Sequence, residues 1–170
     1  MKLPVAFALA LTLAAPALAG RLAGGETFFD RVPTLTRAAT SELSSTYNYA
    51  RYFFEVSVPT TSGEPLGALT IGIPQRIVVP RPDMIEVLDG NGRPVPFTVE
   101  RSDPRTVRIV FNEPISPGNQ VSVQFFPMRG PRVGGYYLFP VTAYPAGPGA
   151  RAQFLSFGRI QFISAGGGRG

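Results

Sequence analysis

Hydrophobic and polar residues alternate along much of this chain, most regularly over residues 106–126. Val107, Ile109 and Phe111 alternate with Arg108 and Val110, and Val121, Val123 and Phe125 alternate with Ser122 and Gln124. Alternation with a period of two places one set of side chains on one face of a β-strand. Between the two apolar runs, Pro114, Pro117 and Gly118 interrupt both strands and helices. The pattern therefore predicts two antiparallel strands joined by a loop, with a half-buried face to which further strands add.

Segments of similar character recur on both sides of this pair. They are residues 32–40, 51–58, 66–73, 84–88, 95–99, 135–144, 153–157 and 159–163. Residues 84–88 and 95–99 flank Asp89-Gly90-Asn91-Gly92, whose turn dipeptides are typical of a β-hairpin. The aromatic segment 135–144 is predicted to form one long strand. Residues 153–163 are predicted to form either one bulged strand or two short ones.

Helical periodicity is nearly absent beyond the N-terminal segment. Short strand-like segments follow one another at a spacing of roughly 8–12 residues, which is the pattern of a sandwich. The many prolines favour irregular strand edges that resist aggregation. We therefore predict an all-β fold, a single Ig-like antiparallel β-sandwich of about seven to nine short strands. A chain of 170 residues can bury enough surface to fold without disulfides, and this one has no cysteine.

The N-terminus has the organisation of a secretory signal peptide. Lys2 supplies a positive start, residues 3–15 form an apolar run, and Ala17-Leu18-Ala19 fits the small-x-small pattern before a cleavage site. A membrane anchor is the alternative, but the run is shorter than the roughly 20 residues that span a bilayer. The expected divisions are a signal peptide over 1–19, a flexible terminus over 20–26, a sandwich domain over 27–164 and a disordered Gly-rich tail over 165–170. We expect the protein in the periplasm or elsewhere in the cell envelope, or outside the cell.

The side-chain inventory excludes several classes of chemistry. The chain has no histidine and no cysteine, and its only lysine is Lys2. Ser-His, Cys-His and Ser-Lys nucleophiles are therefore absent from the mature chain, as are the usual zinc and copper ligands. Met84 and Met128 remain as thioethers, and isolated methionines usually fill a core. We expect no metal and no cofactor, and no nucleic-acid partner, because the arginines are spread along the chain.

Carboxylates are the remaining acid–base groups. A pair of them can hydrolyse glycosides at defined separations, so Glu86, Glu100 and Glu113 are candidates for a glycan hydrolase. Surface charge and turn capping are the competing interpretation. Asp89 and Asn91 could supply oxygen ligands to calcium, but Arg93 and Pro94 stand where an EF-hand loop needs further ligands. The hairpin turn is the preferred interpretation there, and a ligand or metal carrier stays an alternative function.

The aromatic segment 135–144 is the best candidate for a contact surface. Tyr136 and Tyr137 point to opposite faces of a strand, so one of them should be exposed. Tyrosines near arginines suit contacts with a sugar or a protein. The predicted binding residues are Tyr136, Tyr137, Tyr144, Arg129 and Arg132, with Arg151 nearby and with Tyr47, Tyr49 and Tyr52 as further exposed rings. Core packing with ordinary edge exposure is the alternative.

Several motifs occur together in one order along the chain. They include Leu35-Thr36-Arg37-Ala38-Ala39-Thr40, Tyr52-Phe53-Phe54, Gly135-Tyr136-Tyr137-Leu138-Phe139 and Phe157-Gly158-Arg159. In this the chain resembles an exported cyanobacterial family known as a domain of unknown function, number twenty-eight-oh-eight. The resemblance implies a sandwich fold, export and a cyanobacterial envelope setting, and it implies no catalytic residue. A weaker likeness, through 87–96 and 111–123, is to bacterial Ig-like modules and small periplasmic copper-binding sandwiches.

Together these observations favour a non-enzymatic cell-envelope protein that acts through surface contacts with a protein or polysaccharide partner. The missing imidazoles, thiols and amines argue against most enzymes. A carboxylate-type glycan hydrolase and a periplasmic ligand or metal carrier are the alternatives.

Overall fold

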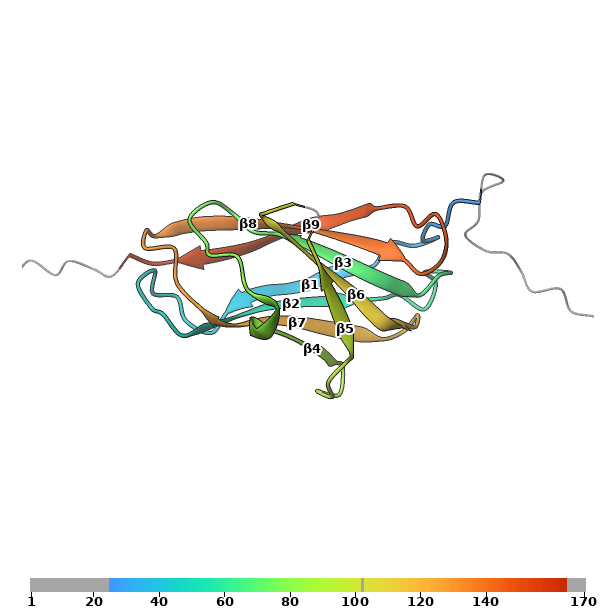
Figure 1. The fold of residues 1–170 in the computed structure, drawn as a ribbon, viewed down its shortest axis with the longest axis horizontal. Coiled ribbons are helices and arrows are strands. Elements are labelled where there is room, and N and C mark those ends of the chain that lie inside the picture. Colours follow the sequence, from blue (N-terminus) through green and yellow to red (C-terminus); the bar gives the residue numbers. More distant parts are fainter. Residues whose placement is uncertain (1–24, 102, 165–170) are drawn as a thin grey trace, which may run out of the picture.

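The computed structural model describes residues 25–101 and 103–164. The predicted signal peptide, residues 20–24 of the predicted flexible terminus and the predicted tail over 165–170 lie outside the described residues. The described chain forms two β-sheets that pack face to face (Figure 1). The predicted all-β sandwich is confirmed, with nine strands in the described part.

All neighbouring strands within each sheet are antiparallel. In spatial order, the four-stranded sheet contains β1 (Thr34–Thr40), β2 (Ala50–Ser57), β7 (Gln120–Met128) and β4 (Ile85–Asp89). The five-stranded sheet contains β5 (Phe97–Glu100), β6 (Thr106–Ile115), β3 (Leu66–Gly72), β8 (Gly135–Pro145) and β9 (Gln153–Phe162). One 3-10 turn, η1 (Pro82–Met84), precedes β4.

The core lies between the sheets and is built from the inward residues of each strand. Fully buried side chains on the four-stranded sheet include Tyr52, Phe54, Val56, Val121, Val123 and Phe125, and on the five-stranded sheet Leu69, Ile71, Val107, Ile109, Phe139 and Val141. The ring of Phe54 lies 5.4 Å from that of Phe125 and 5.2 Å from that of Phe139, so it joins the two sheets. Burying one side chain of this size contributes about 1.5–3 kcal/mol.

The most regular alternation, over 106–126, forms two strands that belong to different sheets. β6 pairs with β3 and β5, whereas β7 pairs with β2 and β4. The connecting loop is tied to the end of β2, since the N–H of Gly118 donates to the Val58 carbonyl and the N–H of Val58 donates to that of Asn119. The prediction of two adjacent strands is therefore wrong. Both strands turn an apolar face to the core, but from opposite sides of it.

The turn at 89–92 starts a hairpin that ends almost at once. The N–H of Val95 donates to the carbonyl of Val87 at 2.9 Å, and Leu88 bridges to Pro94. Pro94 and the following Pro96 have no N–H with which to extend the ladder. The chain then crosses to the other sheet, where β5 pairs with β6. The predicted hairpin of 84–88 with 95–99 is wrong beyond its tip.

The two C-terminal strands follow their prediction closely. β8 is one long strand, and β9 is a single strand with a register shift: Val141 faces Ser156, whereas the next residue, Thr142, faces Phe154. Leu155 is thus an extra residue, which makes a β-bulge. Of the two alternatives for 153–163, the bulged strand is the one that forms.

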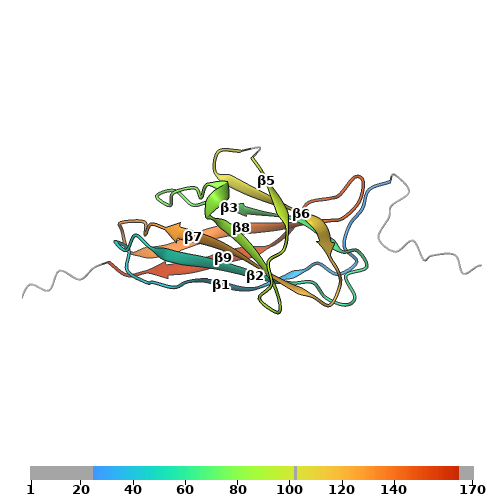
Figure 2. The same ribbon diagram turned by 60° about the horizontal axis from the view of Figure 1, so that its bottom comes forward.

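One side of the sandwich is closed by β1, which lies against β9 (Figure 2). Ala38 of β1 lies against Gly158 of β9, and the N–H of Ile163 donates to the Leu43 carbonyl at 2.7 Å. β4 and β5 stand at the other ends of their sheets. The outer faces of β8 and β9 are left on the surface, and these faces carry the candidate site.

Candidate functional site

Exposed apolar side chains gather on the outer face of β8 and β9. Tyr136, Leu138, Phe154 and Phe157 are between 47% and 56% exposed. Leu138 stands directly opposite Arg159 in the ladder, and residues paired in this way point to the same face. Tyr136, Leu138, Phe154, Phe157 and Arg159 are called the aromatic strip below.

The β-bulge makes this strip continuous. Residues 154 and 157 are three positions apart, so in a regular strand their side chains would point to opposite faces. The extra residue turns Phe154 outward, where its ring contacts that of Phe157 in a T-shaped arrangement with 5.1 Å between centroids. Bulges commonly re-aim a side chain in this way.

Arginines lie along the strip. The guanidinium of Arg159 lies 4.3 Å from the centroid of the Tyr136 ring, and that of Arg108 lies 4.1 Å from the Tyr144 ring farther along β8. Cation–π contacts near the protein surface contribute about 0.5–1 kcal/mol each. Next to Tyr136 is an open pocket of about 430 Å³ whose lining includes Arg76. The strip is therefore apolar along its length and positively charged at its margin.

The five predicted binding residues do not gather in one place. Tyr136 is on the strip, but Tyr137 points inward and packs against the core, because neighbouring residues of a strand point to opposite faces. Tyr144 lies near the far end of β8. Arg129 and Arg132 are exposed on the loop after β7, and within 25–101 and 103–164 no cation–π contact joins them to a tyrosine. Their role in binding stays a prediction.

Of the further tyrosines predicted to be exposed, Tyr47 and Tyr49 are exposed and Tyr52 is not. Tyr52 has 0% exposure, so that prediction is wrong. It occupies the same face of β2 as Phe54, and its hydroxyl donates to the carbonyl oxygen of Arg129 at 3.0 Å. A buried polar atom with such a partner is compatible with a core position.

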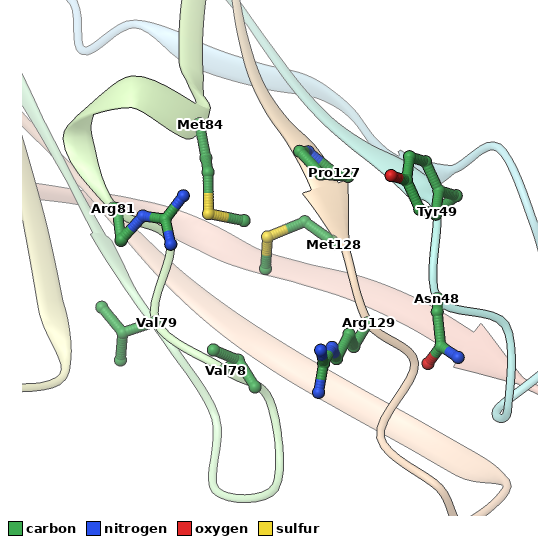
Figure 3. A pocket seen from close by; sticks show the side chains of 9 residues that line it. All are labelled: Asn48, Tyr49, Val78, Val79, Arg81, Met84, Pro127, Met128 and Arg129. Atoms are coloured by element: carbon green, nitrogen blue, oxygen red, sulfur yellow. The ribbon is translucent and has the colours of Figure 1, made fainter.

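Arg129 lines a separate pocket of about 440 Å³ (Figure 3). The pocket lies between the end of β7, the residues before β2 and the segment that leads into β4. Its lining residues are Asn48, Tyr49, Val78, Val79, Arg81, Met84, Pro127, Met128 and Arg129. None of these residues belongs to the aromatic strip, so the two surfaces are distinct.

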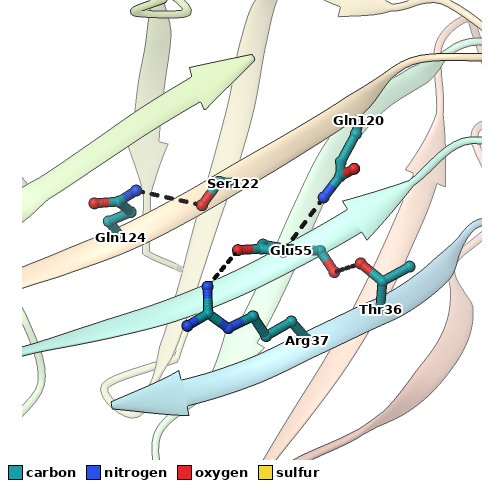
Figure 4. A network of polar contacts seen from close by, with 6 residues as sticks. All are labelled: Thr36, Arg37, Glu55, Gln120, Ser122 and Gln124. Atoms are coloured by element: carbon teal, nitrogen blue, oxygen red, sulfur yellow. Dashed lines mark hydrogen bonds and ion pairs between the residues drawn. The ribbon is translucent and has the colours of Figure 1, made fainter. Parts of the chain in front are cut away.

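The outer face of the four-stranded sheet carries a network of polar side chains (Figure 4). Glu55 is at its centre: Arg37 pairs with one carboxylate oxygen at 2.9 Å, and the amide of Gln120 donates to the other at 3.3 Å. The amide of Gln124 donates to the hydroxyl of Ser122 at 3.4 Å. Because these groups bond to one another, they have less capacity left for a ligand. This face is the weaker candidate for a contact surface.

The candidate catalytic glutamates lie on three different strands. Glu86 on β4 pairs with Arg51 at 2.8 Å, and Glu100 on β5 pairs with Arg108 at 3.1 Å. Those two strands belong to different sheets, and both glutamates are exposed. Glu113 is near the other end of β6 from Arg108, roughly 17 Å away along the strand. The three glutamates therefore do not share a cleft.

Glu113 does share a shallow pocket of about 280 Å³ with Asp89. The Asp89 carboxylate accepts the N–H groups of Arg93 and Asn91, each at 2.8 Å. These bonds hold the pKa of the Asp89 carboxyl below its ordinary value. A glycosidase pair needs one carboxyl that keeps its proton, and Asp89 is poorly suited to that role. The same two hydrogen bonds explain Asp89 as a residue that stabilises the turn, so its position needs no calcium ion to explain it.

Comparison with protein families now bears on the fold. The sequence model of the family described as "Protein of unknown function (DUF2808)" matches residues 26–162. The chain belongs to this family. The resemblance drawn from the strand aromatics and turn residues is thereby confirmed.

Two solved structures are similar to this DUF2808 chain. One is described as "Crystal structure of the RrgA Jo.In complex", with 9% identity, a TM-score of 0.48, and coverage of 77% of this chain and 78% of the other. The second is the collagen-binding domain from a Staphylococcus aureus adhesin, with 10% identity, a TM-score of 0.42, and coverage of 80% of this chain and 98% of the other. No curated protein matches the sequence.

Four members of the strip in this DUF2808 chain were missed as contact residues. They are Leu138, Phe154, Phe157 and Arg159. Alternation within β8 gives Leu138 the same face as Tyr136 and could have found it. Phe154 depends on the bulge and Arg159 on the β8–β9 register, and neither is visible in a local pattern.

The described residues contain no group of three or more side chains that could hold a metal ion. They also contain no helix that is long and apolar enough to cross a bilayer.

Proposed function

We propose that this DUF2808 chain is an exported, non-enzymatic cell-envelope protein whose aromatic strip binds a protein partner. The observation that carries the proposal is the gathering of Tyr136, Leu138, Phe154 and Phe157 on one face of two adjacent strands. Contiguous exposed apolar side chains commonly mark interaction sites, and aromatic residues with arginine dominate the binding energy of many interfaces. Arg159 supplies the arginine at one end of the strip.

A protein partner is favoured over a polysaccharide by the chemistry of these side chains. Leu138, Phe154 and Phe157 have no polar atom with which to bond a sugar hydroxyl. The T-shaped pair of Phe154 and Phe157 presents one ring edge-on to the other, so it does not offer two coplanar rings for sugars to stack on. Apolar side chains of a partner would instead be buried against both rings, at about 25 cal/mol per Å².

The export and the absence of catalysis rest on the sequence. The N-terminal residues follow the pattern of a signal peptide, and the chain lacks the histidine and cysteine on which most nucleophilic enzymes depend. The engagement of Glu86, Glu100 and Asp89 by arginines or backbone N–H groups supports the same conclusion.

The test is capture of the partner from envelope fractions of the producing cell by immobilised protein. The doubly substituted variant Phe154→Ser/Phe157→Ser should capture it at least about tenfold more weakly, because both rings are hot-spot candidates. Phe126→Ser is the matched control, because Phe126 is an exposed phenylalanine (38%) on the other sheet, where its ring lies under the guanidinium of Arg51. It should capture normally.

Enzymatic pretreatment of the fraction separates the kinds of partner. Digestion with protease should abolish capture, and digestion with glycosidases should leave it unchanged. Equal capture by both serine variants, or capture that survives proteolysis, would contradict the proposal. Turnover of an envelope glycan that is lost in Glu113→Gln would replace it with the hydrolase alternative.

A further inference from the structure

The pocket in Figure 3 combines an apolar floor with positive charge at its rim. Met84 and Met128 point toward one another across it, and Val79 lines it from the segment that leads to Arg81. Met128 is fully buried, so its thioether belongs to the core directly beneath the pocket, whereas Met84 is half-buried and reaches the pocket surface. Methionine is flexible and polarisable, and it adapts to apolar surfaces of varied shape. The volume of about 440 Å³ falls within the roughly 300–1,000 Å³ of small-molecule sites.

The charges around the pocket select an anion. Arg81 and Arg129 are the charged side chains of the lining, which contains no carboxylate. Arg81 is already in a two-bond ion pair with Asp83, at 3.0 and 2.9 Å. Arg129 enters no ion pair with any other residue of the described chain. The guanidinium of Arg129 therefore disfavours a cuprous ion at the methionines and suits a carboxylate.

Separate contacts hold the walls of the pocket in place. The wall formed by 78–81 follows Ile77, which is 2% exposed and whose carbonyl accepts a bond from Arg105 at 2.7 Å. The backbone at Arg129 is held by the buried hydroxyl of Tyr52. The ring of Tyr49 rests edge-on against Phe126, with 6.1 Å between centroids. A cavity with walls fixed before binding loses less entropy when a ligand enters.

We propose that this pocket binds a small organic acid with an aromatic body and one carboxylate. The aromatic body lies against Met84 and Val79, above the buried thioether of Met128, and the carboxylate bonds to the guanidinium of Arg129. Tyr49, 65% exposed, stands at the rim of the pocket. The site is separate from the aromatic strip, so this proposal stands or falls independently of the partner-binding function.

Methionine methyl groups give a direct readout. The chain has three methionines, and the two in the described part both line the pocket. In protein labelled with ¹³C at the methionine methyl groups, titration with 2-naphthoate should shift the Met84 and Met128 signals saturably. The near-isosteric substitutions Met84→Leu and Met128→Leu each remove one signal and so assign it. Arg129→Gln should weaken binding about tenfold, the effect of losing one charge-assisted bond.

Three comparisons make the test decisive. Arg132→Gln is the matched control, an exposed arginine on the same loop but outside the lining, and it should bind naphthoate like the native protein. The cation 2-naphthylmethylammonium should leave both methyl signals in place. Absence of a saturable shift, equal binding of anion and cation, or equal weakening by both arginine substitutions would overturn the proposal. So would saturation at lower concentration by an acetylated tripeptide with a free C-terminal Phe carboxylate, because the occupant would then be a chain terminus.

Discussion

The phenol of Tyr52 joins the core to the loop that carries Arg129. Its ring contacts those of Phe139 and Phe162, with 6.0 and 5.7 Å between centroids, and its hydroxyl donates to the Arg129 carbonyl. Burial raises the pKa of Tyr52, because a phenolate would be desolvated there, and the nearby Tyr137 adds to the effect. The native state therefore keeps this proton at a pH where the unfolded chain, with a pKa of about 10, has lost it. The resulting stability is fully present below pH 10 and is lost as pH rises further.

Removal of that single hydroxyl has a predictable result. Tyr52→Phe should lower the free energy of unfolding by about 1 kcal/mol at pH 7, since the Arg129 carbonyl loses its donor. Between pH 9 and 11 the variant should lose less stability than the native protein, because one proton no longer distinguishes the two states. Urea unfolding at each pH measures both effects. Tyr136→Phe removes a hydroxyl at an exposed position and is the control at pH 7, where it should change the free energy of unfolding by less than about 0.5 kcal/mol. A native-like alkaline loss in Tyr52→Phe would contradict the argument.

The exposure of Tyr52 was predicted wrongly because the residue type was given more weight than the strand pattern. Its position has the same parity as Phe54 and Val56, so alternation alone would have turned it inward. The polar end of tyrosine favoured the surface, and the acceptor that satisfies it belongs to a loop some 77 positions away in sequence. Burial of the ring could be predicted from the pattern. The partner that makes the burial acceptable could not.

Among the elements, the segment between β3 and β4 has no regular strand and depends on Arg105. The guanidinium of Arg105 donates to the carbonyl oxygens of Ile73, Pro74 and Ile77. Three acceptors from one short segment meet one planar group, and this suits arginine because its donors are arranged in a fixed fork. The segment then delivers Val78, Val79 and Arg81 to the wall of the small-acid pocket.

Arg105→Lys is expected to loosen this segment, although the positive charge at position 105 is kept. An ammonium group is compact and cannot meet all three acceptors in the same geometry. We expect a loss of about 1–3 kcal/mol in the free energy of unfolding and faster amide hydrogen exchange over 77–81. Arg93→Lys, at an arginine whose side chain is 75% exposed, should change stability by less than about 0.5 kcal/mol. Unaltered exchange in Arg105→Lys would show that the segment is held by Ile77 alone.

The elements also show the limit of local patterns. Alternation identifies which face of β6 and of β7 is buried, and the structure buries all six residues expected on that face: Val107, Ile109, Phe111, Val121, Val123 and Phe125. It does not say which strand lies alongside, because a turn rich in Gly and Pro serves both a hairpin and a connection between sheets. The same limit applies to the candidate site. Tyr136 could be expected on the surface, but its contact with Arg159 could not be predicted, because that contact depends on how β8 pairs with β9.

At the scale of the whole molecule, one side of the sandwich is closed by contact between β1 and β9. Gly158 stands at this contact, and a Cβ atom there would lie 2.8 Å from the Cβ of Ala38 and 3.2 Å from the ring of Phe54. The missing side chain lets the two sheets approach where the core ends. On the reverse face of the same strand lie Phe157 and Arg159, so closure of the sandwich also supports the aromatic strip.

Gly158→Ala should therefore separate the sheets at this point and destabilise the fold by about 1–3 kcal/mol, the usual cost of overpacking. Urea unfolding measures the loss. Gly90→Ala is the control, since a Cβ there would meet only Gln120, at 3.7 Å or more. Combining Gly158→Ala with Ala38→Gly removes the closer of the two clashes, so the double variant should lose less than the sum of the single losses. Strictly additive losses would mean that Ala38 and Gly158 do not limit the approach of the sheets, and that the ring of Phe54 alone sets their distance.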